Sequence, residues 1–161
     1  MRGILFRGFH PDKNGTEKVL VNGKFIKGFW AYGDLRHRES SGKCFVEIIT
    51  KCDGYDNYKY FYVIPETVGQ YTRLKDKNGK KIFANDIVKN DWCFVKGNSI
   101  VKFGEYKTFD MSNDYPQGHL GFYLEHINEI NLKTTRKDIL FFANNCEIIG
   151  NIYSNPELLE E

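Results

Sequence analysis

The chain has 161 residues, enough for one domain or two small lobes with a buried core. Aromatic residues make up 16% of the chain, charged residues make up 27%, and the formal net charge is +2. This composition excludes a disordered chain, and the net charge is too small to indicate a nucleic-acid partner by itself.

The first half of the chain reads as a series of antiparallel hairpins. Apolar runs on both sides of Asn22-Gly23 are typical of a hairpin with a two-residue turn. Gly33-Asp34 is expected to end an aromatic strand, and the polar segment Arg36–Lys43 is expected to form a loop. The predicted elements of this half are strand Ile4–Phe9, hairpin Lys18–Ile26, and strands Gly28–Leu35, Cys44–Ile49 and Tyr58–Val63.

A dense run of turn signals follows. Pro65 biases its neighbour toward extended geometry, so the preceding strand is expected to end there, with a turn or one helical turn up to Gly69. Asn78-Gly79 favours the positive φ values of a two-residue type I′ turn. A further turn is expected at Asn85-Asp86, at the entry to a new strand.

The second half of the chain is also strand-rich. A turn at Lys96–Asn98 is expected to pair two strands, and Lys137–Asn144 is predicted as a short helix, with a strand as the alternative. Asn155-Pro156 starts another short helix, because proline suits the first helical position. The predicted strands are Ile87–Val95, Ser99–Tyr106, Phe122–Ile127 and Glu147–Tyr153.

These elements predict a mainly β fold of antiparallel hairpins with one or two short helices. The strands of the second half suit an SH3-like small barrel or a curled sheet. We expect an N-terminal β lobe over residues 1–66 and a barrel-like lobe with a short C-terminal helix over residues 67–161. The boundary is expected within Pro65–Gly69, and a single compact domain is the alternative.

Two clusters of residues form the candidate contact surface. The first is a basic hairpin tip, whose cations suit phosphate contacts and equally suit a solvated turn that discourages strand-edge aggregation. The second is a stripe of alternate tyrosines, which suits base stacking, a subunit interface, or a sheet with one face in the core. The residues are Arg73, Lys75, Lys77, Lys80 and Lys81 in the basic tip and Tyr58, Tyr60 and Tyr62 in the tyrosine stripe.

The sequence contains no familiar catalytic or cofactor motif. Its histidines lack metal-ligand spacing, and it has no phosphate loop, dinucleotide fingerprint or serine elbow. Asp34, Arg36 and His37 could form a polar site, but no nucleophile or second carboxylate accompanies them. We therefore predict a protein that is not an enzyme and holds no cofactor or metal. The cysteines, expected to be free and mostly buried, are Cys44, Cys52, Cys93 and Cys146.

Three segments of the chain resemble one protein family and occur in the order expected for that family. They are VIPETVGQYTRLKDKNGKKIFANDIV at Val63–Val88, RGF at Arg7–Phe9 with GFWAYGDLRH at Gly28–His37, and CEIIGNIYSNPELL at Cys146–Leu159. Together they resemble the YopX family of phage and prophage proteins, whose opening pattern is usually closer to W-x-Y-G-D-L. Met111–Lys137 departs from the likeness and reads as a variable region. The resemblance implies a mainly β protein of phage or prophage origin without an assigned biochemical activity.

The leading functional hypothesis is a non-catalytic accessory or binding protein of the host bacterial cytoplasm. It is expected to self-associate as a homo-oligomer and to bind a host or phage protein that the sequence does not identify. The alternative is a weak nucleic-acid-binding module that uses the basic tip and the tyrosine stripe, and an enzyme around Asp34 and His37 ranks last. No membrane role is expected, because no run approaches the roughly 20 apolar residues of a span. Arg7 and His10 interrupt the N-terminal apolar run before a signal peptide could form.

Overall fold

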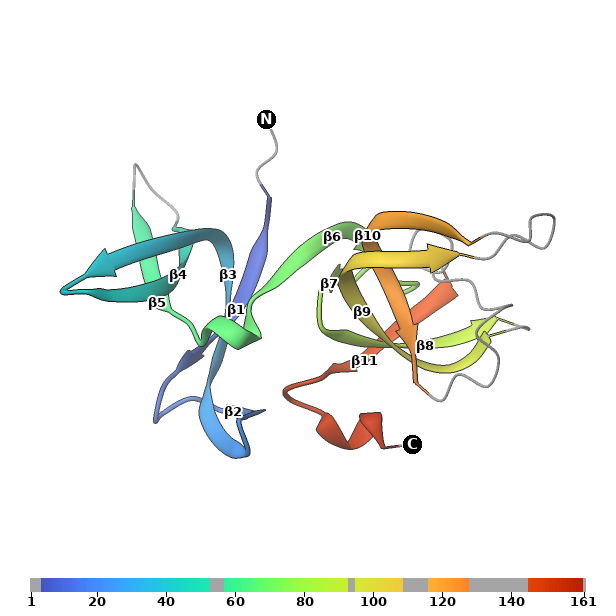
Figure 1. Cartoon of the computed structure of the whole chain (residues 1–161). Coiled ribbons are helices and arrows are strands. Elements are labelled where there is room, and N and C mark those ends of the chain that lie inside the picture. Colours follow the sequence, from blue (N-terminus) through green and yellow to red (C-terminus); the bar gives the residue numbers. More distant parts are fainter. Residues whose placement is uncertain (1–3, 53–56, 93–94, 109–115, 128–144, 161) are drawn as a thin grey trace. The chain divides into compact units, whose positions relative to one another are not determined.

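The computed structural model describes residues 4–52, 57–92, 95–108, 116–127 and 145–160 (Figure 1). These residues form mainly antiparallel β-strands with short 3-10 helices, so the predicted mainly β fold is confirmed. The chain divides into two compact units, Met1–Tyr71 and Thr72–Glu161. The lobes predicted from the sequence, 1–66 and 67–161, stay a prediction.

The first unit is a set of paired antiparallel strands. Their bounds are β1 Phe6–Pro11, β2 Glu17–Val21, β3 Lys24–Ser40, β4 Lys43–Lys51 and β5 Tyr58–Tyr62. The strand order is β5-β4-β3-β1, and β2 also pairs with β3. The first residues of β6, Gly69–Lys75, continue the order by pairing Gln70 with Phe6. This unit therefore contains the tyrosine stripe, whose three residues lie on one side of β5.

Strand β3 runs farther than the sequence predicted. It is continuous over 17 residues, so the expected turn at Gly33-Asp34 and the expected loop over Arg36–Lys43 are both wrong. Its last residues, Asp34–Ser40, pair with β4, and only Ser41 and Gly42 connect the two strands. The segment was misread because it is polar, although one solvent-facing side of an antiparallel sheet is ordinarily polar.

Two hairpins of this unit turn through two residues with positive φ. Asn22 and Gly23 have φ of 50° and 75°, which confirms the predicted Asn-Gly hairpin between β2 and β3. Ser41 and Gly42 have φ of 54° and 71° in the same arrangement. Turns of this kind match the right-handed twist of the strands and fix the register of the pair.

One face of the β3-β4-β5 sheet is buried in the core of the first unit. Ile48 is fully buried, and its opposite neighbours in the register are Leu35 on β3 and Phe61 on β5. Because side chains alternate along a strand, the residues between these face the other side. The core cluster consists of Ala31, Ile48 and Val63, packed by Phe6, Phe29, Leu35, Val46, Phe61 and Val68.

The second unit contains the rest of β6 and a four-stranded antiparallel sheet in the order β10-β9-β8-β11. The bounds of its strands are β7 Lys81–Phe83, β8 Asp86–Trp92, β9 Val95–Thr108, β10 Gln117–His126 and β11 Cys146–Asn151. Its core cluster is Ile82, Val88, Val101, Leu124 and Cys146. Among the described strands this order is open at β10 and β11, so the SH3-like barrel stays a prediction.

The predicted turn at Lys96–Asn98 is wrong. These residues lie inside β9, where Gly97 pairs with Asn90, and the pairing continues to Trp92 opposite Val95. Residues 93–94, between these two strands, lie outside the described part. In the variable region Met111–Lys137, residues 116–127 are described and contain β10.

Short helices occur where proline signals predicted them. η1 spans Pro65–Thr67 and η3 spans Pro156–Leu159, and both are 3-10 helices with proline in the first turn. Asn155 precedes η3, but its side chain does not cap the helix. The helix predicted over residues 137–144 lies outside the described residues.

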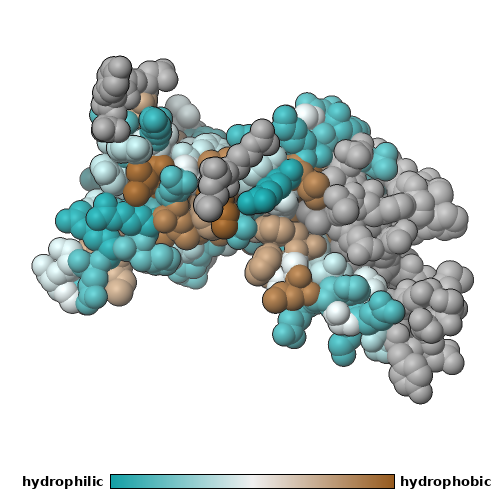
Figure 2. Space-filling view, turned by 90° about the horizontal axis from the view of Figure 1, so that it is seen from above, coloured by the Kyte–Doolittle hydropathy of each residue, from teal (hydrophilic) through white to brown (hydrophobic). Residues whose placement is uncertain are grey.

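The surface is mixed in character. On the face that Figure 2 presents, hydrophilic residues cover much of the described surface, and hydrophobic residues lie among them in smaller groups. Within the described residues, no helix has the length and apolar character needed to cross a bilayer.

Candidate functional site

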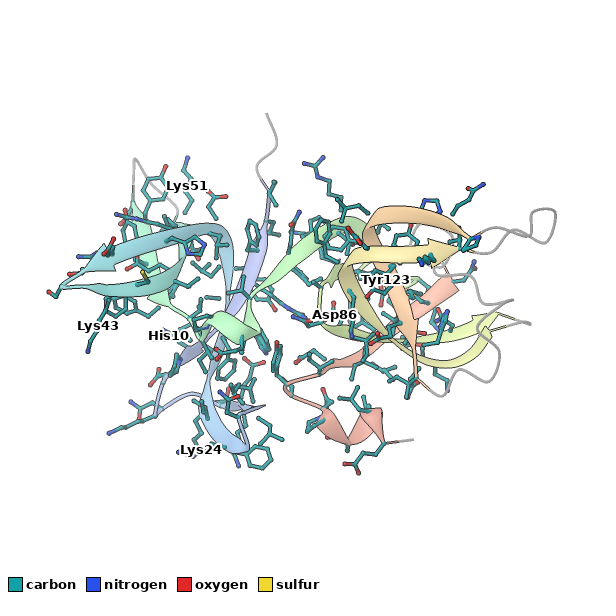
Figure 3. The ribbon with its side chains drawn as sticks, viewed as in Figure 1. His10, Lys24, Lys43, Lys51, Asp86 and Tyr123 are labelled. Carbon is teal, nitrogen blue, oxygen red and sulfur yellow. The ribbon has the colours of Figure 1, made fainter. Side chains whose placement is uncertain are left out.

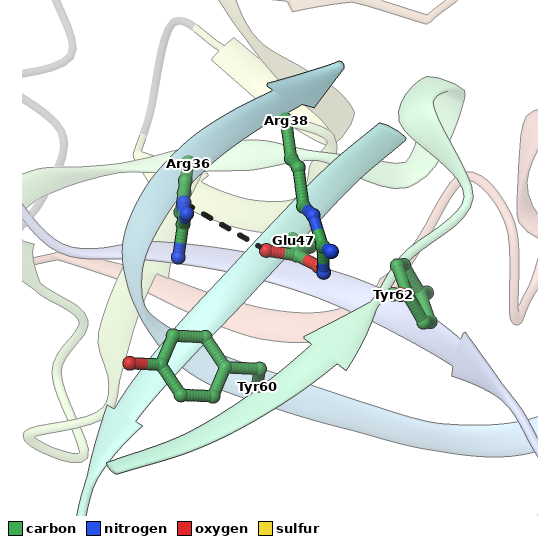
Figure 4. Close-up of a pocket in the computed structure, with 5 residues that line it drawn as sticks. All are labelled: Arg36, Arg38, Glu47, Tyr60 and Tyr62. Atoms are coloured by element: carbon green, nitrogen blue, oxygen red, sulfur yellow. Dashed lines mark ion pairs between the residues drawn. The ribbon is translucent and has the colours of Figure 1, made fainter. Parts of the chain in front are cut away.

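The exposed face of the β3-β4-β5 sheet brings charged and aromatic side chains together. In the strand register, Arg36 lies opposite Glu47, and Glu47 lies opposite Tyr62. Residues that pair directly share a face, so these three side chains project to the same side. Arg38 and Tyr60 have the same parity on their strands and join them, as Figure 4 shows.

These five side chains line a shallow open depression of about 430 Å³. Glu47 lies between the two arginines, and the rings of Tyr60 and Tyr62 flank it from β5 (Figure 4). This volume lies within the range of about 300–1,000 Å³ that small-molecule sites occupy. We call this set, Arg36, Arg38, Glu47, Tyr60 and Tyr62, the arginine–tyrosine face.

The carboxylate of Glu47 is buried beneath the arginines. Only 3% of its side chain is exposed, whereas the side chains of Arg36 and Arg38 are 48% and 49% exposed. Arg36 Nε lies 3.9 Å from Oε2, and Arg38 Nη1 lies 3.7 Å from Oε1. Both distances exceed the 2.7–3.2 Å range of an N–H···O hydrogen bond. The two arginines therefore balance the charge of Glu47. Its Oε2, however, accepts no hydrogen bond from any described residue.

The tyrosine rings present aromatic surface to solvent. Tyr60 is 53% exposed and Tyr62 is 50% exposed, and Tyr58 at the start of the strand is also exposed. The guanidinium carbon of Arg36 lies 5.8 Å from the centre of the Tyr60 ring, within the range of a cation–π contact. The ring of Tyr62 packs against Phe45, with centroids 5.5 Å apart. The two rings are therefore held in place while one side of each stays accessible.

Basic residues also surround this face within the first unit. Lys43 and Lys51 are exposed and lie at the two ends of β4 (Figure 3). Lys51 pairs with Tyr58, which places a further cation at the end of the tyrosine stripe. These lysines add positive charge at the ends of the face, and Asp34, on the same side of β3 as Arg36, adds a negative one.

The polar site predicted around Asp34, Arg36 and His37 does not form as one cluster. All three residues lie in β3, where alternation sends Asp34 and Arg36 to one face and His37 to the other. His37 therefore lies across the sheet from Arg36. The enzyme hypothesis loses the geometry on which it was based.

The other described histidines make contacts within the fold and do not come together in one site. His10 Nδ1 donates to the carbonyl of Tyr62 at 2.6 Å, which ties β5 to β1 (Figure 3). His119 and His126 have opposite parity on β10 and therefore face opposite sides of the sheet. The described residues contain no group of three potential metal ligands.

Ser99, Asn90 and His126 form a polar cluster in the second unit. Asn90 Nδ2 donates to Ser99 Oγ at 3.0 Å, and Ser99 Oγ lies 2.7 Å from His126 Nδ1. A serine beside a histidine is the arrangement of an activated nucleophile. Ser99, however, is fully buried, so its hydroxyl does not meet solvent or a substrate. The cluster ties β8, β9 and β10 together.

The basic tip belongs to the second unit, and the tyrosine stripe belongs to the first. The tip joins β6 to β7, and all five of its cationic residues are exposed. Lys77 forms an ion pair with Glu147 of β11, with Nζ 2.7 Å from Oε2. This hydrogen bond and the charge of Lys77 lower the pKa of Glu147 below its ordinary value.

The tip is built on the buried side chain of Asp76. Its Oδ1 accepts from the backbone N–H groups of Asn78 and Lys80 at 2.9 and 2.8 Å, and its Oδ2 accepts from Ile148 N–H at 3.1 Å. Gly79 has a φ of 79°, whereas Asn78 does not have a positive φ. The predicted two-residue type I′ turn is therefore wrong. The chain uses a longer turn, because the Asp76 carboxylate binds the amide groups inside it.

The described cysteines are free thiols. Cys44 is exposed, Cys52 is partly buried and Cys146 is buried, so only one of these three fits the expectation of burial. Burial, with a smaller contribution from the charge of Asp76, raises the pKa of Cys146 to about 11. Its thiol is consequently protonated and unreactive at neutral pH. Cys93 lies outside the described residues.

The sequence pattern predicted the tyrosines but not Arg38 and Glu47. The available signal was alternation: charged Asp34, Arg36 and Arg38 occupy every second position, as on the solvent side of a strand. Ser41-Gly42 then supplies a short turn before the next strand. A loop over the same residues would not have aligned the arginines with Glu47.

Fold and site together define an antiparallel β protein with an exposed sheet face of paired arginines and tyrosines. The family model described as YopX protein matches residues 23–160. The chain therefore belongs to the YopX family. The crystal structure of protein EF1440 from Enterococcus faecalis is similar at 20% identity, over 95% of this chain and 97% of that one, with a TM-score of 0.35. No curated protein matches the chain.

Proposed function

We propose that this chain is a non-catalytic binding protein that holds single-stranded nucleic acid on the arginine–tyrosine face. The observation that carries the proposal is the pair of half-exposed rings, Tyr60 and Tyr62, beside two half-exposed arginines on one side of a sheet. Exposed aromatics next to cations on a sheet surface are the combination that binds single strands through stacking and phosphate contacts.

The spacing of the two tyrosines suits splayed bases. Residues two apart on a strand are separated by about 6.6 Å. Stacked nucleotides rise by about 3.4 Å each. Bases that sit on Tyr60 and Tyr62 would therefore be unstacked from each other, as in single-stranded loops and ends. A duplex, whose bases remain stacked, fits this surface poorly.

The charge of the face suits a phosphate backbone. Arg36 and Arg38 together carry two positive charges, and Glu47 neutralises one of them. Arginine can bind phosphate through two parallel hydrogen bonds, and neither arginine uses its donors at hydrogen-bond distance on Glu47. The guanidinium groups are thus half exposed and available for an anion.

The test is a titration of fluorescently labelled oligothymidine and of a duplex at low salt, followed by anisotropy. Tyr60→Ala and Tyr62→Ala should each weaken single-strand binding about 10-fold, since one base stack contributes about 1–3 kcal/mol. Arg36→Gln and Arg38→Gln should each reduce the steepness of the salt dependence: the magnitude of the slope of log Kobs against log salt concentration should fall by about 0.7. Single strands that fail to bind the wild-type protein at low salt would refute the proposal.

Matched controls come from the same unit. Phe25→Ala removes an exposed aromatic side chain of β3 that lies outside the face. Lys24→Gln removes an exposed charge at the start of the same strand (Figure 3). Both variants should bind like the wild type. Lys75→Gln and Lys80→Gln test whether the basic tip contributes to the same binding.

The proposal includes finer expectations that rest on the family likeness and on the strand pattern. We expect a phage- or prophage-encoded protein that acts in the cytoplasm of the bacterial host without catalysing a reaction. We also expect the strands of the second unit to curl into a small SH3-like barrel. An experimental structure addresses the barrel, and fractionation of lysogenic cells addresses the location.

Self-association as a homo-oligomer is the second candidate function. Leu120 and Phe103 are 74% and 58% exposed. Their register positions place both on the same face of the β9-β10 pair. Two exposed apolar side chains on one face favour contact with another protein surface. Light scattering of the wild type and of Leu120→Ser tests this: a wild-type monomer at high concentration would remove the candidate.

A further inference from the structure

The buried carboxylate of Glu47 is the feature that stacking and phosphate contacts leave unused. It lines the depression, it is almost fully buried, and neither arginine approaches it within hydrogen-bond distance. A carboxylate is an acceptor only, and a buried acceptor without a donor destabilises the protein. A ligand that supplies hydrogen-bond donors at this point would satisfy it.

The arginines that cover Glu47 can turn away from it only when donors of a ligand take their place, because a buried carboxylate left without its ion-pair partners strongly destabilises the protein. Each is about half exposed, and neither would break a hydrogen bond to the carboxylate by moving. A phosphate group of a bound strand attracts both guanidinium groups toward solvent. Phosphate binding would therefore uncover the carboxylate beside the base that stacks on Tyr60 or Tyr62.

We infer that Glu47 makes this face selective for guanine. Guanine carries two adjacent donors, the N1 imino and N2 amino groups, on its Watson–Crick edge, which match the two oxygens of one carboxylate. Cytosine and adenine each offer one amino group there, and thymine offers one imino group. Single-stranded bases are commonly read on this edge. The inference rests on the proposed function, since it names the base that the proposed site prefers.

The experiment compares oligothymidine with the same oligonucleotide carrying one central guanine. Anisotropy titration of the wild-type protein should give about 10-fold tighter binding for the guanine strand, the discrimination of one good bidentate pair. Hypoxanthine, which lacks the N2 amino group, should lose most of this gain. 7-Deazaguanine, which keeps both donors, should retain it. These changes are made in the ligand, so the folding of a variant does not affect them.

Glu47→Gln supplies the matching change in the protein. It should lose the preference for guanine, so that the variant binds the thymine and guanine strands with equal affinity. Equal binding of the thymine and guanine strands by the wild type would overturn the guanine inference and leave the proposed function standing. Equal binding of guanine and hypoxanthine strands would also overturn it. Failure of every strand to bind would instead refute the proposed function.

Discussion

Replacing Asp76 with alanine should destabilise the second unit by about 3 kcal/mol. The carboxylate accepts three backbone hydrogen bonds, and a hydrogen bond to a charged group contributes about 1.5–3 kcal/mol. Asn78 and Lys80 are exposed at the tip, so water replaces much of what their N–H groups lose. The N–H of Ile148, in β11, loses its hydrogen bond to Asp76, which lies 72 residues earlier in the sequence. The total is therefore below the sum of three full contributions.

Urea unfolding followed by far-UV circular dichroism measures this change, and hydrogen exchange at Ile148 locates it. Asp12→Ala is the matched control, because Asp12 accepts one exposed hydrogen bond from Asn14 N–H in the first unit. The control should change the free energy of unfolding by less than about 1 kcal/mol. If Asp76→Ala changed stability no more than the control, the conclusion that Asp76 holds the tip to β11 would be wrong.

Three other changes follow from the structure. Because Lys77 lowers the pKa of Glu147, the stabilisation by this ion pair is present above the ordinary pKa of 4.5 and is lost as pH falls through the lowered pKa. Glu147→Gln should therefore flatten the acid side of a pH–stability curve measured in urea. Iodoacetamide should label Cys44 in the folded protein and Cys146 only after unfolding, as mass spectrometry will show. Gly33→Ala should cost about 3 kcal/mol in thermal or urea unfolding, because its Cβ would lie 1.9 Å from a carbonyl oxygen of β4.

Local turn chemistry explains why the class of fold could be predicted. Asn22-Gly23 adopts the positive φ values that the dipeptide favours, and the strands on either side follow from it. The same dipeptide at Asn78-Gly79 forms a different turn, because the Asp76 carboxylate accepts a hydrogen bond from Asn78 N–H and is itself held by Ile148 N–H. A dipeptide signal is thus sufficient where the dipeptide alone shapes the turn and insufficient where other side chains bind its backbone.

The candidate site was harder to predict, because it depends on strand pairing. The tyrosines of β5 occupy every second position of a single strand, so the sequence alone predicts that they share a face. Glu47 could not be assigned to them, since its position opposite Arg36 and Tyr62 depends on the register of two separate strand pairs. Polar composition also pointed to a loop where β3 continues. Composition misleads in this way wherever one side of a strand faces solvent.

The two-residue connection at Ser41-Gly42 limits how related sequences can vary. The length of the turn sets which residues of β3 and β4 are opposite each other. An insertion that shifted β4 by one position would turn Glu47 toward the core and Ile48 toward solvent. Relatives that use this face are therefore expected to tolerate insertions in other connections and to keep this one short. Loop length at a single hairpin then becomes a marker of which family members share the arginine–tyrosine face.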